Sequence, residues 1–340
     1  MSATDKNYLV QAFSQLGNRL LLPDDNLSSL IQNEAFRNPW FTTENVEHAI
    51  TATGKMLNEA DLQQWLHSFD IKDHVPKKVG LILAGNIPLV GFHDILCVLA
   101  SGNTALIKPS SQDDRLIKYV LQLLFEIAPL LKDRVIYTDR LTGFDAVIAT
   151  GSNNTSRYFD YYFGKVPNII RKNRNSVALL TGFEAAEDFA ALGHDIFDYF
   201  GLGCRNVSAL LVPKDYKFDS FFEGIQQFET VAMHSKYNNN YDYNKAIYLV
   251  NRDKHLDNGF LLLKEDERIA SPLAVVYFRY YETLDDAITI LREQEDQIQC
   301  VVGKVAGGIS NQVVDFGNSQ APRLWDYADG VDTMQFLCSL

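Results

Sequence analysis

The chain has 340 residues, of which 46% are hydrophobic and 22% are charged, and its formal net charge is -12. This length predicts about two domains, and an acidic chain without a long basic stripe argues against a nucleic-acid groove. No apolar run reaches the roughly 18 residues of a membrane span, no signal-peptide core follows the first residues, and the four cysteines show no metal-binding spacing. We therefore expect a cytoplasmic protein without a metal site.

Residues 7–70 carry apolar side chains at helical spacing and predict helices that pack against a sheet. From residue 77 onwards, short apolar runs typical of buried parallel strands alternate with helical segments. The expected strands are residues 79–84, 104–107, 134–137, 145–149 and 177–180. This alternation predicts a doubly wound α/β sheet, in which ligands bind at the carboxyl ends of the strands.

Polar turns follow three of these strands at the predicted ligand-binding edge. They are Gly85-Asn86, Lys108-Pro109-Ser110-Ser111 and Thr150-Gly151-Ser152. Pro88 fits the first turn of the helix that comes next. Each turn also has a plain structural explanation, since Asn86 and Ser152 suit helix caps and Lys108 suits a solvated strand end. The glycine fingerprint usual in dinucleotide sites, G-x-G-x-x-G, is missing after the first strand.

A second unit is expected from residue 181 onwards. Its predicted helices are residues 184–200, 218–233 and 284–295, and its predicted strands are residues 207–212, 247–250, 259–263, 273–278 and 299–302. The stretch 234–244 is rich in Asn and Tyr, which favours a surface loop and suggests a lid.

Cys204 stands behind Gly201 and Gly203 and directly before an apolar strand. Because glycines let a ligand approach the main chain, this thiol is a candidate nucleophile. The alternative is a small, buried, unreactive cysteine, which is the more common case. Cys97 and Cys300 lie in apolar segments and are expected in the core. The basic cluster 171–174 is either solvated surface or a contact for a phosphorylated ligand.

Four motifs in order resemble those of the aldehyde dehydrogenase superfamily. They are Gly85-Asn86-Ile87-Pro88, residues 102–110, Thr150-Gly151-Ser152 and Gly201-Leu202-Gly203-Cys204. Residues 269–273 and 283–288 resemble a later segment of its catalytic domain. Within the superfamily the chain is most similar to the bacterial luminescence-type fatty acyl-CoA reductases. The resemblance implies two doubly wound α/β domains with the active site in the cleft between them.

On this resemblance, residues 1–180 form N-terminal helices and a Rossmann-like dinucleotide-binding domain. Residues 181–305 form the catalytic domain, and residues 306–340 return to the first domain or to an oligomer interface. The resemblance and the tail segment 311–316 together lead us to expect a homodimer.

The resemblance also assigns roles to the motif residues. Cys204 would be the nucleophile that forms an acyl-enzyme thioester, and Asn86 would donate a side-chain N–H to the oxyanion together with the Cys204 backbone N–H. The cofactor-binding residues would be Lys108, Ser110, Ser111, Gly151 and Ser152. The first three would hold the adenine-side ribose, where serines and a lysine favour NADP and leave NAD open. The last two would place the pyrophosphate at a helix N-terminus.

The chain departs from the superfamily pattern at two places. Residues 174–177 lack the glutamate that activates water in ordinary aldehyde dehydrogenases, and Arg268 stands near the place of the glutamate that binds the nicotinamide ribose. An acyl-enzyme without a water-activating base should persist until hydride reaches it. We therefore expect NAD(P)H-dependent reduction of an acyl-CoA, a fatty acyl-CoA in the first instance, to an aldehyde. The open alternatives are an aldehyde dehydrogenase, an acyl-phosphate reductase, or a catalytically inactive nucleotide-binding relative.

Overall fold

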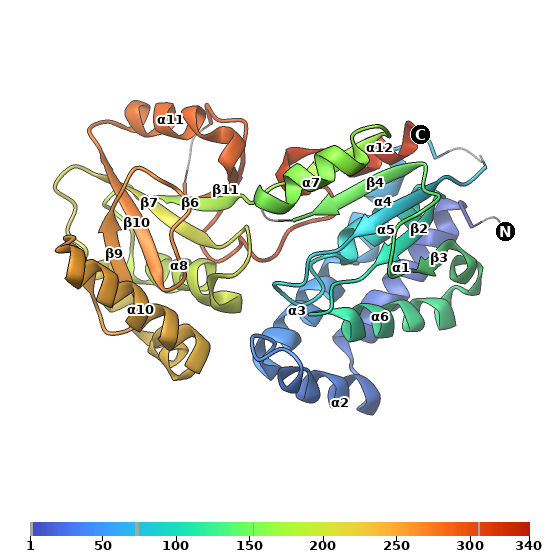
Figure 1. Ribbon diagram of the computed structural model, residues 1–340, viewed down its shortest axis with the longest axis horizontal. Helices are drawn as coiled ribbons and strands as arrows, with labels where there is room; N and C mark the ends of the chain where they lie inside the picture. Colours follow the sequence, from blue (N-terminus) through green and yellow to red (C-terminus); the bar gives the residue numbers. More distant parts are fainter. Residues whose placement is uncertain (1–2, 72–74, 152, 305–306) are drawn as a thin grey trace. The chain divides into compact units, whose positions relative to one another are not determined.

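The computed structural model describes residues 3–71, 75–151, 153–304 and 307–340 (Figure 1). The chain divides into two compact units. Unit 1 comprises Met1–Asn173 and Pro322–Leu340, and unit 2 comprises Arg174–Ala321. Each unit has its own sheet.

In the described residues four α-helices precede the first sheet. They are α1 (Lys6–Leu21), α2 (Asp25–Asn33), α3 (Thr43–Met56) and α4 (Glu59–His67). Each begins behind a side chain that accepts a backbone N–H of its first turn, namely Asp5, Asp24, Thr42 and Asn58. Glycines let α1 and α3 approach closely, because a Cβ on Gly17 would lie 2.9 Å from the Gly54 carbonyl oxygen.

The sheet of unit 1 has five strands, all paired in parallel, in the order β3-β2-β1-β4-β5. The strands are β1 (Lys78–Ile82), β2 (Thr104–Lys108), β3 (Val135–Tyr137), β4 (Ala146–Thr150) and β5 (Asn168–Arg171). The crossover helices are α5 (Phe92–Ala100), α6 (Asp114–Ile127) and α7 (Asn153–Phe163). Because the chain proceeds outwards from β1 to β3 and then returns to β4, the strand order reverses between β1 and β4. That reversal is the usual position of a ligand site in such sheets.

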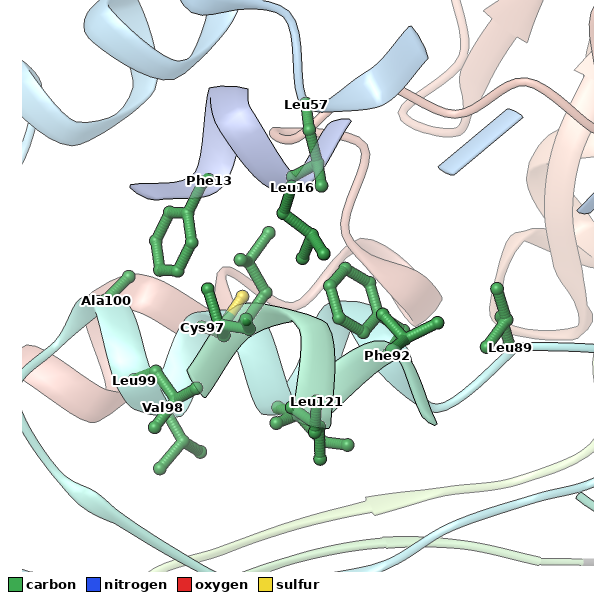
Figure 2. Close-up of a cluster of buried hydrophobic side chains, with 14 of the residues drawn as sticks. Phe13, Leu16, Leu57, Leu89, Phe92, Cys97, Val98, Leu99, Ala100 and Leu121 are labelled. Atoms are coloured by element: carbon green, nitrogen blue, oxygen red, sulfur yellow. The ribbon is translucent and has the colours of Figure 1, made fainter. Parts of the chain in front are cut away.

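The core of unit 1 lies between its N-terminal helices and the helices α5 and α6. Figure 2 shows Phe13 and Leu16 of α1 meeting Phe92 and Cys97 of α5, with the Cys97 sulfur inside the cluster. Residues 322–340, including helix α12 (Thr333–Cys338), belong to the same unit. They are tied to it by the hydrogen bond from Asn103 Nδ2 to the Leu337 carbonyl oxygen, at 3.2 Å.

Unit 2 has a seven-stranded sheet in the order β12-β11-β6-β7-β10-β9-β8. The strands are β6 (Asn175–Leu179), β7 (Val207–Pro213), β8 (Leu256–Asp257), β9 (Leu262–Glu265), β10 (Val275–Tyr281), β11 (Ile298–Val302) and β12 (Gln312–Val314). All neighbours pair in parallel except β8 and β9. The α-helices are α8 (Ala186–Phe197), α9 (Asp219–Gly224), α10 (Ser235–Asn251) and α11 (Leu284–Glu293). In Figure 1, α8 and α11 lie on opposite sides of these strands.

The predicted α/β class with mainly parallel sheets is confirmed, but one strand was assigned to the wrong sheet. Residues 177–180, expected as the fifth strand of the first sheet, fall in and just after β6 of unit 2. The fifth strand of unit 1 is β5, whose sequence Asn-Ile-Ile-Arg is too short and too polar at its ends to stand out. The chain accordingly divides after Asn173, earlier than the boundary predicted at residue 180.

The predicted loop 234–244 and the predicted strand 247–250 are both wrong, because these residues form the single helix α10. His234 is its N-cap and accepts the Tyr237 N–H. Asn and Tyr have modest helix propensity, which hides the pattern. The buried residues nevertheless recur at helical spacing along α10: Tyr237, Tyr241, Asn244 and Tyr248. Packing of this face stabilises the helix where propensity does not.

The tail segment 311–316, which suggested a dimer, contains the edge strand β12 of unit 2. Its residues Gln312–Val314 pair with β11 of the same chain. The segment therefore has a role within the chain, and the homodimer stays a prediction.

Candidate active site

The candidate site residues of unit 1 lie in the turns that follow β1, β2 and β4. These turns meet at the carboxyl edge of the sheet, because all five strands run in parallel. β1 and β4 are the two strands that flank the reversal of strand order. The sequence therefore brings its polar turns to the position where a doubly wound sheet binds ligands.

The turns after β1 and β2 are in direct contact. The Leu83 N–H donates to the Lys108 carbonyl oxygen at 3.3 Å. Beyond it, Gly85 lies so close to Ser110 that a Cβ at position 85 would come within 2.7 Å of the Ser110 Cβ. The Ser110 Oγ in turn accepts the Gln112 N–H at 3.3 Å. Residue 85 must therefore be glycine for the two turns to pack in this way.

Asn86 is exposed at the start of the β1–α5 turn. The prediction that Pro88 begins a helix is wrong, because α5 begins at Phe92 with Gly91 as its N-cap. Asn86 is therefore not the cap of α5, and its role at the oxyanion stays a prediction. Lys108, the last residue of β2, is also exposed.

Gly151 directly follows β4 and precedes α7, which begins at Asn153. Its N–H donates to the Arg171 carbonyl oxygen at 3.4 Å. A Cβ on Gly151 would lie 2.8 Å from the Phe159 ring, so only glycine fits between strand and helix. Ser152, the other predicted pyrophosphate contact, lies outside the described residues. A glycine turn ahead of an 11-residue helix suits an anion.

One arginine of the basic cluster 171–174 is taken up by the fold. Arg171 is buried and forms an ion pair with Asp94, and its Nη2 donates to Thr333 Oγ1 at 3.1 Å. Arg174 is half-buried and donates from Nη1 to the Ile298 carbonyl oxygen at 3.2 Å. Arg171 is therefore not available to a phosphorylated ligand, and the choice between solvated surface and ligand contact stays open for the rest of the cluster.

In unit 2, Cys204 lies half-buried in the turn that leads into β7. The backbone just before it passes through left-handed conformations at Tyr199 (φ 54°), Phe200 (φ 58°) and Gly201 (φ 75°). Two non-glycine residues in this region cost about 1–3 kcal/mol each, and such conformations persist only where the surroundings enforce them.

Asn206 is the residue that enforces this turn. It is buried, and its Nδ2 donates to the carbonyl oxygens of Asp195 at 3.1 Å and of Asp198 at 2.9 Å. Its Oδ1 accepts the Gly203 N–H at 2.8 Å. One amide side chain thus joins the end of α8 to the residue before Cys204. Sequence reasoning gave Asn206 no role, because these partners become neighbours only in the folded chain.

Ser176 holds Cys204 from the neighbouring strand. Its Oγ donates to the Cys204 carbonyl oxygen at 3.1 Å and lies 3.1 Å from the Cys300 sulfur. Ser176 belongs to the stretch 174–177, which contains no glutamate. The side chain of this stretch that reaches the Cys204 turn is therefore a hydroxyl.

The four thiols differ in accessibility. Cys97 and Cys300 are fully buried, as predicted, and burial raises the pKa of the Cys97 thiol well above its ordinary value. Cys338 is an exposed residue near the C-terminus, but its sulfur is partly desolvated, and this desolvation, followed by the charge of Asp332, raises the pKa of its thiol. Cys204 alone among the four combines partial exposure with a position in a constrained turn.

Arg268, near the expected place of a ribose-binding glutamate, is already engaged. Its Nε and Nη2 contact the two Asp266 carboxylate oxygens at 2.8 and 2.6 Å, and its guanidinium lies 5.1 Å from the centre of the Tyr277 ring.

Two further findings concern the part of the chain that the structure describes. In these residues no group of three or more His, Cys, Asp or Glu side chains could hold a metal ion. None of the helices in these residues is both long and apolar enough to cross a membrane.

The structure brings Gly85, Lys108 and Ser110 together in unit 1 and brings Ser176, Cys204 and Asn206 together in unit 2. Asn86 and Cys204 belong to different units.

Comparison with known proteins gives a fold but no close relative. No protein-family model matches the chain, and no curated protein matches it in sequence. Among solved structures, aldehyde dehydrogenase 21 from Physcomitrella patens in complex with succinate is 13% identical, with a TM-score of 0.69, and the match covers all (100%) of this chain and 84% of that one.

Two further solved structures give the same result. The NAD-dependent aldehyde dehydrogenase from Sinorhizobium meliloti is 13% identical with a TM-score of 0.65, covering 90% of this chain and 71% of that one. The Mycobacterium tuberculosis aldehyde dehydrogenase complexed with NAD+ is 15% identical with a TM-score of 0.63, covering 93% and 77%. At these identities the likeness is one of fold, and it confirms the predicted aldehyde dehydrogenase-like architecture of two α/β units.

Proposed function

We propose that this chain reduces an acyl-CoA to an aldehyde with NAD(P)H and that Cys204 carries the acyl group between two half-reactions. The observation that supports this most is the half-buried Cys204 thiol, held by Ser176 and Asn206 in a strained turn of an aldehyde dehydrogenase-like fold. A covalent intermediate divides one difficult reduction into two easier steps.

In the first half-reaction the Cys204 sulfur attacks the thioester carbonyl carbon, and its proton leaves with the CoA sulfur as free CoA-SH. Asn86 Nδ2 and the Cys204 backbone N–H donate to the oxyanion that forms at this stage. A positioned donor of this kind is worth about 3 kcal/mol of transition-state stabilisation. In the second half-reaction the acyl carbon on Cys204 would accept a hydride, which is the chemistry that a bound NAD(P)H would supply. Cys204 then leaves as a thiolate and is reprotonated, and the aldehyde is released.

The edge of the first sheet fits a dinucleotide. Gly151 lies between the end of β4 and the start of α7, and backbone N–H groups at a helix start favour a pyrophosphate. Lys108, Ser110 and Ser111 would contact the adenine-side ribose. A lysine and hydroxyls bind a 2′-phosphate that a carboxylate would repel, so we expect NADPH to bind more tightly than NADH.

Reduction is favoured over oxidation to a free acid by what surrounds Cys204. The residue that reaches its turn from β6 is Ser176, a hydroxyl that is fully buried and cannot act as a carboxylate base for water. This argues against an ordinary aldehyde dehydrogenase. The two remaining alternatives predict different behaviour. An acyl-phosphate reductase would be acylated on the same thiol by an acyl phosphate, whereas an inactive relative would bind nucleotide without being acylated.

Three finer features of the proposal rest on the sequence alone. The similarity to luminescence-type reductases suggests a fatty acyl chain as substrate and a homodimer as the assembly. Four free cysteines suit a reducing compartment, which leads us to propose a cytoplasmic enzyme.

Intact-mass spectrometry after incubation with a panel of acyl-CoAs tests the proposal. The wild-type protein should gain the mass of one acyl group, C204S should gain none, and C338S, which removes the exposed thiol, should behave as wild type. Adding NADPH should remove the acyl mass and release one aldehyde. The proposal fails if the wild type gains no mass, or if the mass gain survives in C204S. Acylation by acyl phosphate alone would favour the acyl-phosphate reductase.

A further inference from the structure

Asp113 is a buried carboxyl group at the start of α6, and it does not cap that helix. The residue at this position ordinarily accepts an N–H from its own helix, yet the Asp113 side chain makes no such bond. Its Oδ2 instead accepts the backbone N–H of Leu89 at 2.7 Å, a residue of the β1–α5 turn. Its Oδ1 is buried and has no hydrogen-bond partner among the described residues.

The Leu89 partner lies in an unusual conformation. Its φ of 59° places it in the left-handed region, which a leucine adopts only under constraint. The bond to Asp113 is therefore made to a strained point of the turn, three residues after Asn86. The strain and the buried bond are two independent signs that the surrounding structure enforces the shape of this turn.

Asp113 is also joined to the turn after β2. Its own N–H donates to the Ser110 carbonyl oxygen at 3.2 Å. Ser110 is the residue against which Gly85 packs without room for a Cβ. Through its backbone and its side chain, Asp113 thus links the turn that carries Lys108 and Ser110 to the turn that carries Asn86.

The surroundings of Asp113 disfavour the charged form of its carboxyl group. Burial raises the pKa of Asp113 well above its ordinary value, the Leu89 N–H lowers it, and the neighbouring charges of Glu34 and Asp114 raise it further. Glu34 is itself buried, faces Arg115 at 3.4 Å and Arg37, and has a pKa that burial raises. A buried carboxyl that serves only packing would be replaceable by an apolar residue at a gain in stability.

Resting on the function proposed above, we propose that Asp113 is a positioning residue that holds the Asn86 turn against the nucleotide-binding turn. One hydrogen bond then sets both the oxyanion donor and the contacts to the adenine-side ribose. Loss of the bond should weaken acylation and nucleotide binding together, although Asp113 touches neither ligand.

The test compares D113A and D113N with D145A as a matched control. Asp145 Oδ2 also accepts a backbone N–H at 2.7 Å, that of Lys78, but at the amino-terminal end of the same β1 strand. D113A should slow Cys204 acylation about tenfold and weaken NADPH binding, measured by its fluorescence. D113N retains an acceptor for the Leu89 N–H and should keep both properties near wild type. D145A should change neither.

A double-mutant cycle separates positioning from a general loss of stability. If Asp113 acts through Asn86, D113A should slow acylation further by less than twofold in an N86A background, whereas any loss of thermal midpoint should add independently. Normal acylation by D113A, or a full tenfold effect in N86A, would overturn the inference.

Hydrogen exchange keeps the inference testable if the proposed function fails. D113A should speed amide exchange in peptides covering residues 85–91, and D113N and D145A should not. If the wild-type protein is never acylated, the proposed function falls, and the exchange result with NADPH binding still decides whether Asp113 holds the two turns together. Unchanged exchange in D113A would refute the inference even in an active enzyme.

Discussion

Ser176 on β6 and Cys204 at the entrance to β7 are joined by a hydrogen bond of 3.1 Å, from the serine hydroxyl to the cysteine carbonyl oxygen. The bond acts on the backbone of Cys204 and leaves the sulfur untouched. The bond therefore fixes the backbone from which the Cys204 side chain extends. The neighbouring Asn206 fixes the backbone of the residues that precede Cys204.

Replacing this serine should affect stability and acylation to different degrees. S176A removes the bond to the Cys204 carbonyl oxygen and also the bond that Ser176 Oγ accepts from the Cys300 N–H. At about 1 kcal/mol for each bond, the free energy of unfolding should fall by roughly 2 kcal/mol. We expect a larger relative effect on the acylation rate, since the Cys204 turn loses a support. Urea unfolding and intact-mass kinetics measure the two. Acylation at the wild-type rate would show that the turn keeps its shape without this bond.

The thiols should differ in their reaction with iodoacetamide. In the native protein Cys338 and Cys204 should be alkylated, and the fully buried Cys97 and Cys300 should react only after unfolding. Preincubation with an acyl-CoA should protect Cys204 and leave Cys338 reactive. Peptide mapping by mass spectrometry gives the extent at each site. Protection of Cys338 instead would place the acyl group on the wrong thiol.

The raised pKa of Asp113 makes stability depend on pH in a defined direction. Its folded pKa lies above its unfolded value near 3.9. The acid form therefore stabilises the fold fully below that value, and this contribution is lost as pH rises towards the folded pKa. D113N does not titrate, so its stability relative to wild type should improve by about 1.4 kcal/mol for each pH unit inside this window. Denaturant unfolding of the wild type and D113N at a series of pH values from about 4 upwards measures the difference in the free energy of unfolding. A difference that does not change with pH would contradict the prediction.

The contact between Gly85 and Ser110 can be tested by a compensating pair. G85A places a methyl group 2.7 Å from the Ser110 Cβ and should destabilise the protein by about 1–3 kcal/mol. The change should also weaken NADPH binding, since it displaces the turn after β2, which carries the proposed ribose contacts, from the turn after β1. S110G in the same chain removes the Ser110 side chain and should restore most of the stability. Thermal midpoints of the single and double variants decide the matter, and no recovery in the double variant would refute the stated cause.

The acyl-enzyme should be long-lived in the absence of NADPH. Ser176 supplies no carboxylate to activate water, so acyl-Cys204 should lose its group slowly, while NADPH should discharge it to aldehyde within the turnover time. Mass spectra of the isolated acyl-enzyme follow both fates. Rapid release of free acid would instead favour the aldehyde dehydrogenase alternative.

Much of the fold could be predicted because local pattern and final environment agree. The runs around β1, β2 and β4 are apolar and end in polar turns, so their strand identity and their shared edge follow from the sequence. β5 could not be predicted as a strand, because two apolar residues between Asn168 and Arg171 do not distinguish a strand from a loop. In α10 the tertiary burial of Tyr237 and Tyr241 decides the structure against weak local propensity.

The same contrast between local pattern and tertiary environment applies to the residues of the candidate site. Cys204 and Asn86 belong to local motifs that resemble those of a known superfamily, so residue pattern alone makes them candidates. Asn206 acts on carbonyl groups eight to eleven positions away, and Ser176 acts across a strand pairing. Asp113 resembles an ordinary helix cap in the sequence, and only the distant Leu89 N–H reveals its role. Such partners depend on the folded backbone and leave no local signal.

Unit 1 is built from two separate stretches of the chain, and this affects how the protein can fold during synthesis. Residues 174–321 emerge from the ribosome as one uninterrupted unit, whereas residues 1–173 must wait for residues 322–340. Until these arrive, the His93 ring lacks the Leu324 carbonyl and the Trp65 indole lacks the Tyr327 hydroxyl. Unit 1 therefore cannot complete its core until a distant second stretch of the chain has been made, whereas unit 2 depends on one continuous stretch.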